Sequence, residues 1–342
     1  MAEINPYLQD VRSLFEAGLD LSPLKGCHIL ITGATGLIGS CLVDVLLNNP
    51  HRNYQVYALG RNEERARQRF SRYWEESDFH FIRHDICQPL ATDISFDYII
   101  HAASNASPNF FKEKPVEVIK SNIMGVESLM DYGLAHDMKR MLFVSSGEIY
   151  GEGNGRQFVE TDSGYVDCAT PRACYPSSKR AAETLCVAYA TEYGADVVIA
   201  RPCHTYGPYF TESDNRVYAQ FIRNLLKGKD IVLKSRGEQH RSWLYVVDAA
   251  FALLTILLKG SKGEAYNVAD ELSNVSIRQL AELLATAENK KVIFDIDEAN
   301  GNTTPITQAT FSTKKLAQLG WQPQTTIAKG LAHTLATLRL LR

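Results

Sequence analysis

The chain has 342 residues, of which 45% are hydrophobic and 22% are charged, and its formal net charge is −3. This length exceeds one average domain and accommodates a substantial core with a smaller appended region. Because acidic and basic residues are mixed along the chain, without a basic face or a charged tail, we expect neither nucleic acid nor an anionic membrane as a partner.

Residues 1–24 form a short leader, in which the spacing of Leu8, Val11, Leu14 and Phe15 predicts a helix. Strands and helices then alternate. The predicted strands are His28–Thr32, Gln55–Leu59, Phe79–Ile82, Tyr98–His101, Met141–Ser145 and Val197–Ala200. The predicted helices are Leu37–Leu47, Glu63–Trp74, Val116–His136 and Ser177–Tyr193. This alternation predicts an α/β fold with a Rossmann-type, doubly wound parallel sheet.

The pattern loosens after Pro202, where a long loop is predicted over Thr205–Arg216, followed by a helix, short strands and further helices. We therefore expect residues 25–203 to form the Rossmann-type domain. Residues 204–342 are expected to form mainly a smaller α/β substrate-binding lobe, with segments that return to the main sheet. Open α/β sheets bind ligands beyond the carboxyl ends of their strands, where such a lobe would lie.

The cysteines are odd in number and scattered, with no Cys-x-x-Cys and no zinc-like spacing with histidine. They predict free thiols, no metal site and a reducing compartment. The first residues include acidic side chains and lack an apolar signal region, and the longest apolar stretch, Ala249 to Leu258, is too short to cross a bilayer. We expect a cytoplasmic protein.

A glycine-rich turn lies between the first predicted strand and the helix that follows it, in the sequence ITGATGLIGS (31–40). Gly33, Gly36 and Gly39 permit a tight turn, a close approach to a pyrophosphate and close packing of helix on strand. The helix N-terminus adds unpaired N–H groups that attract negative charge. The turn predicts a bound dinucleotide; the alternative is an ordinary tight connection.

Further reactive side chains occur at intervals that place them at the same edge of the sheet. Ser146 and Glu148 come directly after the strand Met141–Ser145. Tyr175 and Lys179, four residues apart, share a helix face, so an ammonium could lower the pKa of the phenol and favour it as a general base. Ser146 could bind the same substrate oxygen. Tyr-x-x-x-Lys by itself could be an ordinary surface pair. The order of glycine turn, serine after a strand, and Tyr-x-x-x-Lys along the chain favours a catalytic site instead.

With these motifs the chain resembles the extended short-chain dehydrogenase/reductases, the NAD-dependent epimerase/dehydratase family that acts on nucleotide sugars. The resemblance covers nearly the whole chain. It rests on TGATGLIG (32–39), HDI (84–86), IIHAAS (99–104), the N-x-x-G of 122–125, SSGEIYG (145–151), YPSSK (175–179), RPCHTYGP (201–208) and RSWLYVVDAA (241–250). It implies Ser146, Tyr175 and Lys179 as the catalytic triad, with Glu148 as a further active-site carboxylate.

The same resemblance implies two sets of binding residues. NAD or NADP would be bound by Gly33, Thr35, Gly36, Leu37, Ile38, Gly39, Arg61, Asn62, Asp85, Ile86, Ala102, Ala103, Ser104, Asn122, Ser145 and Pro202. A nucleoside-diphosphate sugar would be bound by Ser107, Asn109, His204, Tyr209, Arg216 and Arg241. Arg216 and Arg241 suit a diphosphate, because charge-assisted contacts favour one; both could instead be solvated arginines.

The reaction depends on the two residues after Ser146, which in this chain are Gly147 and Glu148. Relatives that are 4,6-dehydratases carry Asp-Glu there, UDP-glucuronate decarboxylases carry Ser-Glu, and simple 4-epimerases usually carry neither acid. Tyr209 stands where the decarboxylases have an arginine. Glu148 favours dehydration or decarboxylation through a 4-keto intermediate; 4- or 5-epimerisation and NADPH-dependent reduction of a 4-keto sugar remain alternatives. A non-catalytic dinucleotide sensor is disfavoured by the complete triad.

Two further expectations concern the cofactor and the assembly. Gly60 stands where NAD-preferring relatives place an Asp, and the neighbouring Arg61 could meet a 2′-phosphate, which favours NADP over NAD. Alternatively, Arg61 stacks on adenine or faces solvent. By analogy with the family, a homodimer is expected through the predicted helices Val116–His136 and Ser177–Tyr193.

Overall fold

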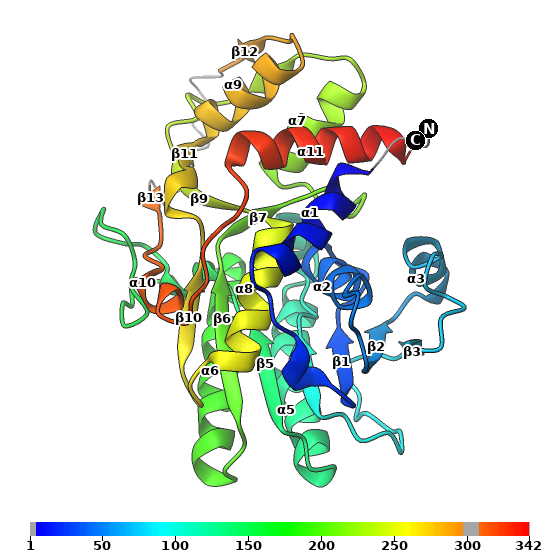
Figure 1. Ribbon diagram of the computed structural model, residues 1–342. Coiled ribbons are helices and arrows are strands. Elements are labelled where there is room, and N and C mark those ends of the chain that lie inside the picture. The colour runs from blue at the N-terminus through cyan, green and yellow to red at the C-terminus, as the bar shows by residue number, and fades with distance from the viewer. Residues whose placement is uncertain (1–4, 297–307, 342) are drawn as a thin grey trace.

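The computed structural model describes residues 5–296 and 308–341. Its centre is a seven-stranded sheet with the strand order β10-β6-β5-β4-β1-β2-β3 (Figure 1). All six strand pairs are parallel. The strands are β1 (His28–Thr32), β2 (Gln55–Gly60), β3 (Phe79–Arg83), β4 (Tyr98–His101), β5 (Arg140–Val144), β6 (Val197–Pro202) and β10 (Ala265–Val268). This confirms the predicted doubly wound fold.

Helices cover both faces of this sheet, because alternate side chains of each strand are apolar on both sides. On one face, Ile29 and Ile31 of β1 belong to a core shared with α2 (Leu37–Leu47) and α8 (Val246–Lys259), which pack together. On the other face, Leu30 belongs to a core shared with α5 (Pro115–Ala135) and α6 (Cys174–Glu192). The carboxyl ends of the strands therefore share one open edge.

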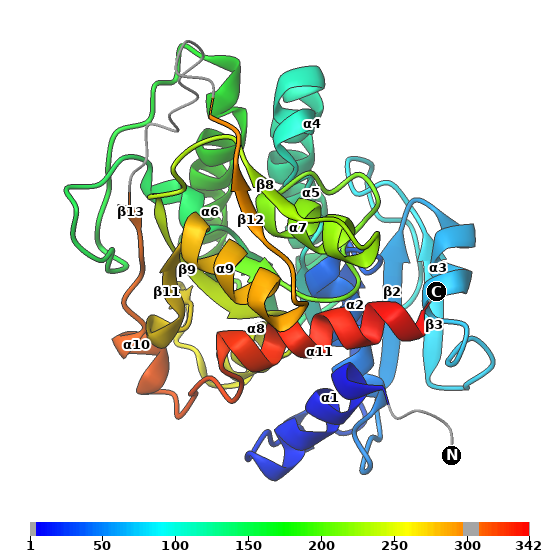
Figure 2. The ribbon, with the colours of Figure 1, turned by 90° about the horizontal axis from the view of Figure 1, so that it is seen from above.

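A smaller lobe lies beyond that edge (Figures 1 and 2). It contains a four-stranded sheet in which β9 (His240–Tyr245) pairs with β7 (His204–Tyr206), β11 (Asn274–Ser276) and β13 (Gln308–Ala309). A second, two-stranded sheet joins β8 (Ile231–Leu233) and β12 (Val292–Phe294). The helices of this lobe are α7 (Val217–Leu226), α9 (Ile277–Ala287) and α11 (Ile327–Leu340), whereas α10 (Lys314–Ala317) packs against β10 of the main sheet.

The segment predicted as a leader is built into the fold. Its helix α1 (Pro6–Glu16) begins after the N-cap Asn5 and packs against α2, α8 and α11 (Figure 2). Buried Asp10 of α1 accepts a hydrogen bond from His333 Nδ1 of α11 at 2.6 Å. The helices α1 and α11 therefore lie together at the junction between the sheet and the smaller lobe.

Two predicted elements differ from the observed ones. The helix predicted over Glu63–Trp74 ends as α3 (Glu63–Arg69), because Phe70 turns inward and packs against Phe79 of β3 with ring centroids 5.3 Å apart. The loop predicted from Thr205 begins inside β7, whose pairing with β9 could not be seen in so short a segment. Short elements such as α4 (Pro108–Glu113) were also not predicted.

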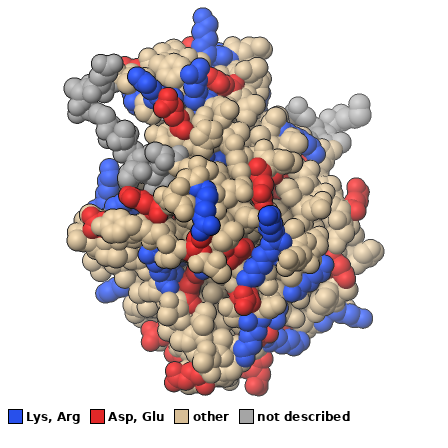
Figure 3. Space-filling model, turned by 90° about the vertical axis from the view of Figure 1, so that its left-hand side faces the viewer, with Lys and Arg blue, Asp and Glu red and all other residues tan. Residues whose placement is uncertain are grey.

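The surface mixes charges of both signs, as Figure 3 shows for one face. In the described ranges, none of the helices combines the length and the apolar composition needed to cross a membrane.

Candidate active site

A cavity of about 1200 Å³ opens at the carboxyl edge of the seven-stranded sheet, between the sheet and the smaller lobe. Segments far apart in the chain line it. Eighteen of the predicted site residues are among them: Gly33, Gly36, Leu37, Ile38, Gly39, Arg61, Ala102, Ser104, Ser107, Ser145, Ser146, Glu148, Tyr175, Lys179, Pro202, His204, Arg216 and Arg241. The predicted cofactor-binding, catalytic and substrate-binding groups thus border one continuous space.

The glycine turn has the close backbone contacts that a dinucleotide cradle needs. Gly33 has a φ of +65°, and a Cβ there would lie 2.7 Å from the backbone of Ala102 and Ala103. A Cβ on Gly39 would lie 2.4 Å from the carbonyl oxygen of Gly33. Gly36 is the N-cap of α2, so the first turn of this helix faces the cavity. The cradle would hold a pyrophosphate against the helix N-terminus.

A buried hydroxyl further along the cavity also suits a bound cofactor. Within the described ranges, Ser145 Oγ is buried and has no hydrogen-bond partner, although it lines the cavity. A buried polar group without a partner is costly, so a ligand atom at this point would satisfy it. Together with the glycine cradle, this hydroxyl makes the cavity fit a nicotinamide dinucleotide.

Several predicted binding residues lie outside the cavity lining. The Thr35 carbonyl accepts a hydrogen bond from Arg65, and the Asn62 side chain caps α3. Asn122 is buried in α5, where it accepts from Ser104 and donates to Ser178. The others outside the lining are Asp85, Ile86, Ala103, Asn109 and Tyr209. None of these eight residues lines the cavity.

Ser146 and Glu148 stand where β5 ends at the cavity. Ser146 caps the short helix η2 (Gly147–Tyr150), and its Oγ accepts a hydrogen bond from the Glu148 amide at 3.2 Å. An interaction of Ser146 with the Tyr175 hydroxyl acts to lower the pKa of the phenol. The serine is therefore oriented toward the tyrosine by the turn that also carries Glu148.

The ionisation of Tyr175 is controlled mainly by burial. Burial and the charge of Glu148 raise its pKa to about 12, against the opposing effects of Ser146, Arg216 and Arg172. Lys179 donates to the Val144 carbonyl at 2.8 Å, and its Nζ lies 5.9 Å from the centroid of the Tyr175 ring. Burial lowers the pKa of Lys179 to about 7. The low phenol pKa expected from the four-residue spacing is not found, because desolvation outweighs the cations.

Glu148 has a partner that sequence reasoning missed. Arg172, on the short helix η3 (Pro171–Ala173), donates from Nη2 to Glu148 Oε2 at 2.7 Å and also lines the cavity. Its place three residues before Tyr175, in the PRACYPSSK segment, was the available signal. An arginine beside the active-site carboxylate keeps that carboxylate in a defined position.

Gly147 leaves no room for a side chain between Ser146 and Glu148. Phe311 packs over it, and a Cβ on Gly147 would lie 2.4 Å from the Cζ atom of that ring. Phe311 is itself held in an aromatic cluster with Tyr150 and Phe158. The position where the dehydratase-like acid would stand is therefore closed by an apolar wall.

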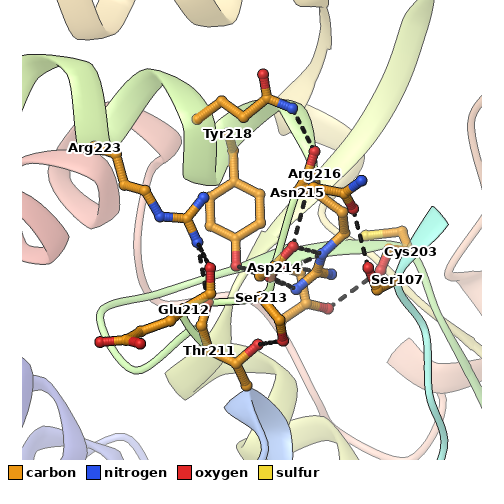
Figure 4. Close-up of polar contacts among 12 residues, drawn as sticks. Ser107, Cys203, Thr211, Glu212, Ser213, Asp214, Asn215, Arg216, Tyr218 and Arg223 are labelled. Atoms are coloured by element: carbon orange, nitrogen blue, oxygen red, sulfur yellow. Dashed lines mark hydrogen bonds and ion pairs between the residues drawn. The ribbon is translucent and has the colours of Figure 1, made fainter. Parts of the chain in front are cut away.

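Arg216 is fixed by the loop that precedes α7 (Figure 4). Its Nε and Nη2 donate to the carboxylate of Asp214, at 3.0 and 2.6 Å, and its Nη2 also donates to Tyr218 Oη at 3.2 Å. In the same loop Asn215 accepts from Ser107 Oγ at 3.0 Å and donates to Asn109 at 2.5 Å. The loop and the start of α4 are thereby joined above the cavity.

The other predicted substrate contacts divide between the cavity and the core. His204 lines the cavity on β7, and burial together with Arg241 and Arg216 lowers its pKa to about 3, so the ring is neutral at physiological pH. Tyr209 lies outside the cavity lining: its ring packs against Tyr7, and the guanidinium of Arg69 lies 3.7 Å from its centroid. The ring of Tyr209 thus lies against α1 and α3, away from the cavity lining.

Two arginines line the cavity near the end of β2. Arg61 donates to Glu117 of α5 at 3.2 Å, with 56% of its side chain exposed. Arg65, which was not predicted, lies one helical turn further along and donates to the Thr35 carbonyl at 2.8 Å. Its place in the first turn of α3, shortly after Arg61 in the segment GRNEER (60–65), was the missed signal.

Known proteins with similar sequences and folds place this site in context. Residues 29–269 match the NAD dependent epimerase/dehydratase family. UDP-glucuronic acid decarboxylase 5 of Arabidopsis thaliana is 33% identical over 305 residues, which cover 89% of this chain and 87% of that protein. Two solved structures share the fold. One is a dTDP-glucose 4,6-dehydratase from Streptomyces venezuelae with NAD bound, with a TM-score of 0.78 and 24% identity over 92% of this chain and 97% of the other.

The second is a UDP-glucuronic acid 4-epimerase from Bacillus cereus in complex with UDP-glucuronic acid and NAD, with a TM-score of 0.79 and 23% identity. The alignment covers 92% of this chain and all of that one. The match extends over the glycine cradle, the serine, the tyrosine and the lysine described above. The chain therefore belongs to the NAD dependent epimerase/dehydratase family.

Proposed function

We propose that the protein oxidises a hydroxyl of a nucleoside-diphosphate sugar at C4 and then acts on the resulting keto sugar with Glu148. The observation that carries this proposal is the convergence of Ser146, Tyr175 and Glu148 on the cavity that also contains the glycine cradle. Relatives that are UDP-glucuronic acid decarboxylases support a nucleotide sugar as substrate. The cavity volume of about 1200 Å³ suits a dinucleotide and a nucleotide sugar together.

The side chains divide the proton transfers between them. A bound nicotinamide cofactor would accept hydride from the sugar carbon and later return it. Tyr175 takes the hydroxyl proton, with Ser146 holding the same oxygen and the buried Lys179 lying behind the ring. A ketone acidifies the neighbouring carbon, and Glu148 is the carboxylate that can accept a proton there. We place dehydration or decarboxylation ahead of epimerisation because Glu148 is present.

The test is to incubate the purified protein with UDP-glucuronic acid, UDP-glucose, dTDP-glucose, GDP-mannose and CDP-glucose, and to identify products by mass and NMR. Loss of carbon dioxide or of water is the expected result for one of them. A product of unchanged mass with an inverted centre would establish epimerisation instead. Failure to convert any of these sugars, with or without reduced cofactor, would contradict the proposal.

A second candidate function is a net reductase of a 4-keto nucleotide sugar that consumes NADPH. The observation in its favour is the pair Arg61 and Arg65 at the end of β2, where a 2′-phosphate would lie. Such an enzyme would oxidise NADPH in stoichiometric amounts when given a 4-keto sugar. The leading function recycles its cofactor, so absorbance at the nicotinamide wavelength separates the two.

The same pair of arginines leads to a prediction about cofactor choice. We expect the protein to bind NADP more tightly than NAD, because Arg61 can exchange its exposed ion pair with Glu117 for a 2′-phosphate. Arg61→Ala should weaken NADP binding about tenfold, the size of one charge-assisted contact, and leave NAD binding unchanged. Isothermal titration of both cofactors measures this.

The matched control is Arg67→Ala. Arg67 lies on α3, the helix that follows Arg61, with 57% of its side chain exposed; it is paired with Glu63 and lies outside the cavity lining. It should leave both affinities unchanged. Equal or tighter NAD binding by the wild-type protein would contradict the role of Arg61.

We further infer that the two parts of the chain bind different ligands. Residues 25–203 would hold the cofactor, and residues 204–342 would mainly bind the substrate.

We also infer a homodimer. The supporting observation is apolar exposure on α5 and at the end of α6, where Val116, Ile119, Val187 and Tyr193 are 63%, 39%, 41% and 58% exposed. Light scattering that reports a monomer would contradict it. Cytoplasmic location stays a prediction, to be tested by cell fractionation.

A further inference from the structure

Glu148 and Tyr175 are connected by a layered arrangement of side chains from three elements. The Tyr175 ring stacks on the Phe111 ring of α4, with centroids 4.8 Å apart and planes at 22°. The guanidinium of Arg172 lies 4.8 Å from the centroid of Phe111 and pairs with Glu148 at 2.7 Å. Phe111 and Tyr175 are almost fully buried, whereas Arg172 is 54% exposed and Glu148 is 33% exposed.

We propose that Arg172 is a positioning residue that uses Phe111 as a platform to hold the Glu148 carboxylate beside Tyr175, so that both groups reach one substrate. This inference rests on the proposed function, in which Glu148 moves a proton after Tyr175 has done so. In this role Arg172 transfers no proton itself; it acts through Glu148 and through the ring on which Tyr175 stacks.

The geometry favours arginine over any other cation at this position. A guanidinium is planar, so it can lie against an aromatic ring and donate to a carboxylate from its edge at the same time. A lysine ammonium would keep the charge without the plane. Because Glu148 stands on a single short turn, η2, its side chain gains its fixed orientation from this partner. A carboxylate misplaced by about 1 Å can lose about 100-fold in rate.

Arg172 also compensates a repulsion inside the site. The groups that act on Tyr175 are Glu148, which raises its pKa, and Arg216 and Arg172, which lower it, with Lys179 behind the ring. Arg241 faces Glu148 from β9. Removing Arg172 would leave the charge of Glu148 less balanced next to the phenol. The pKa of Tyr175 would then rise, and the limb over which activity increases with pH would move to higher pH.

The experiment compares Arg172→Gln, Arg172→Lys and the matched control Arg156→Gln, using the sugar from the panel that is turned over fastest. Arg156 is 64% exposed, is paired with Asp162, and lies outside the cavity lining. Arg172→Gln should lower kcat about 10- to 100-fold, move the rising limb to higher pH, and change KM less than about threefold. Arg172→Lys should return the rising limb of the pH profile to its wild-type position and should restore only part of kcat.

Solvent-deuterium incorporation at the carbon beside the ketone reports the proton transfer that is assigned to Glu148. It should fall in Arg172→Gln in proportion to kcat, while the melting temperature stays within the range of the control. Phe111→Leu removes the aromatic platform but keeps an apolar side chain. Its kcat and deuterium incorporation should fall less than those of Arg172→Gln.

The outcomes separate this inference from the function on which it rests. If Arg172→Gln matches Arg156→Gln in kcat, pH profile and deuterium incorporation, while Glu148→Gln loses incorporation, Arg172 has no positioning role. If Glu148→Gln itself retains full incorporation, the proposed function is wrong, whatever Arg172 does. The inference is supported if kcat and deuterium incorporation fall in Arg172→Gln and are partly restored in Arg172→Lys.

Discussion

Tyr175→Phe is expected to lower kcat by about 100- to 10,000-fold, because the variant loses the one hydroxyl that can take the proton of the substrate. Cofactor affinity should change little, since the ring, its stacking on Phe111 and the glycine cradle all remain. Steady-state kinetics and a cofactor titration measure the two effects. The wild-type rate should rise with pH, as the pKa of Tyr175 is raised, and the residual rate of the variant should not.

Tyr193→Phe is the matched control. Tyr193 follows α6, the helix that carries Tyr175, and 58% of it is exposed. It should retain wild-type turnover. Turnover of Tyr175→Phe close to that of this control would remove Tyr175 from the mechanism and, with it, the proposed oxidation.

Gly39→Ala is the second substitution with a large expected effect. Its Cβ would lie 2.4 Å from the Gly33 carbonyl oxygen and 2.9 Å from Ala34 Cα, so the backbone of the turn has to move. Overpacking of this kind costs about 1–3 kcal/mol of unfolding free energy. Cofactor affinity should fall at least about tenfold, because the shifted turn no longer holds the cradle against α2. Urea unfolding and cofactor titration test both.

Gly194→Ala separates lost stability from lost binding. Gly194 has a φ of +74° and no atom within 4 Å of its added Cβ, and it lies outside the cavity lining. The strain of an alanine there should cost about 1 kcal/mol without affecting the cofactor. Cofactor binding by Gly39→Ala as tight as that by Gly194→Ala would show that the turn is not the cradle.

Much of the core was predictable because its signals are local. Each central strand and its following helix carries its own periodicity, so β1, β4 and α2 were predicted with the bounds that the structure has. The glycine turn could be identified by its position between a strand and a helix. The residues predicted to line the cavity mostly do so, because parallel strands bring their carboxyl ends to one edge whatever the loops contain.

The remaining features depend on contacts between segments that are distant in sequence. Phe311 closes the space over Gly147, and Tyr209 turns away from the cavity to lie against Arg69. No spacing rule predicts either contact, since each results from the way the smaller lobe folds back on the sheet. The short strand β7 was missed for the same reason. Three residues are too few to show a strand pattern, and this segment is a strand because it pairs with β9.

The sequence by itself therefore determined the doubly wound sheet, the glycine turn between β1 and α2, and the placement of Ser146, Tyr175, Lys179 and Glu148 at one edge of the sheet, because these are matters of local pattern and order. Tertiary structure decided how those groups are charged and held. Burial raises the pKa of Tyr175, although a lysine lies four residues away, and Arg172 pairs with Glu148 across Phe111. Desolvation and ion pairing depend on the whole surroundings of an atom, which only the folded chain defines.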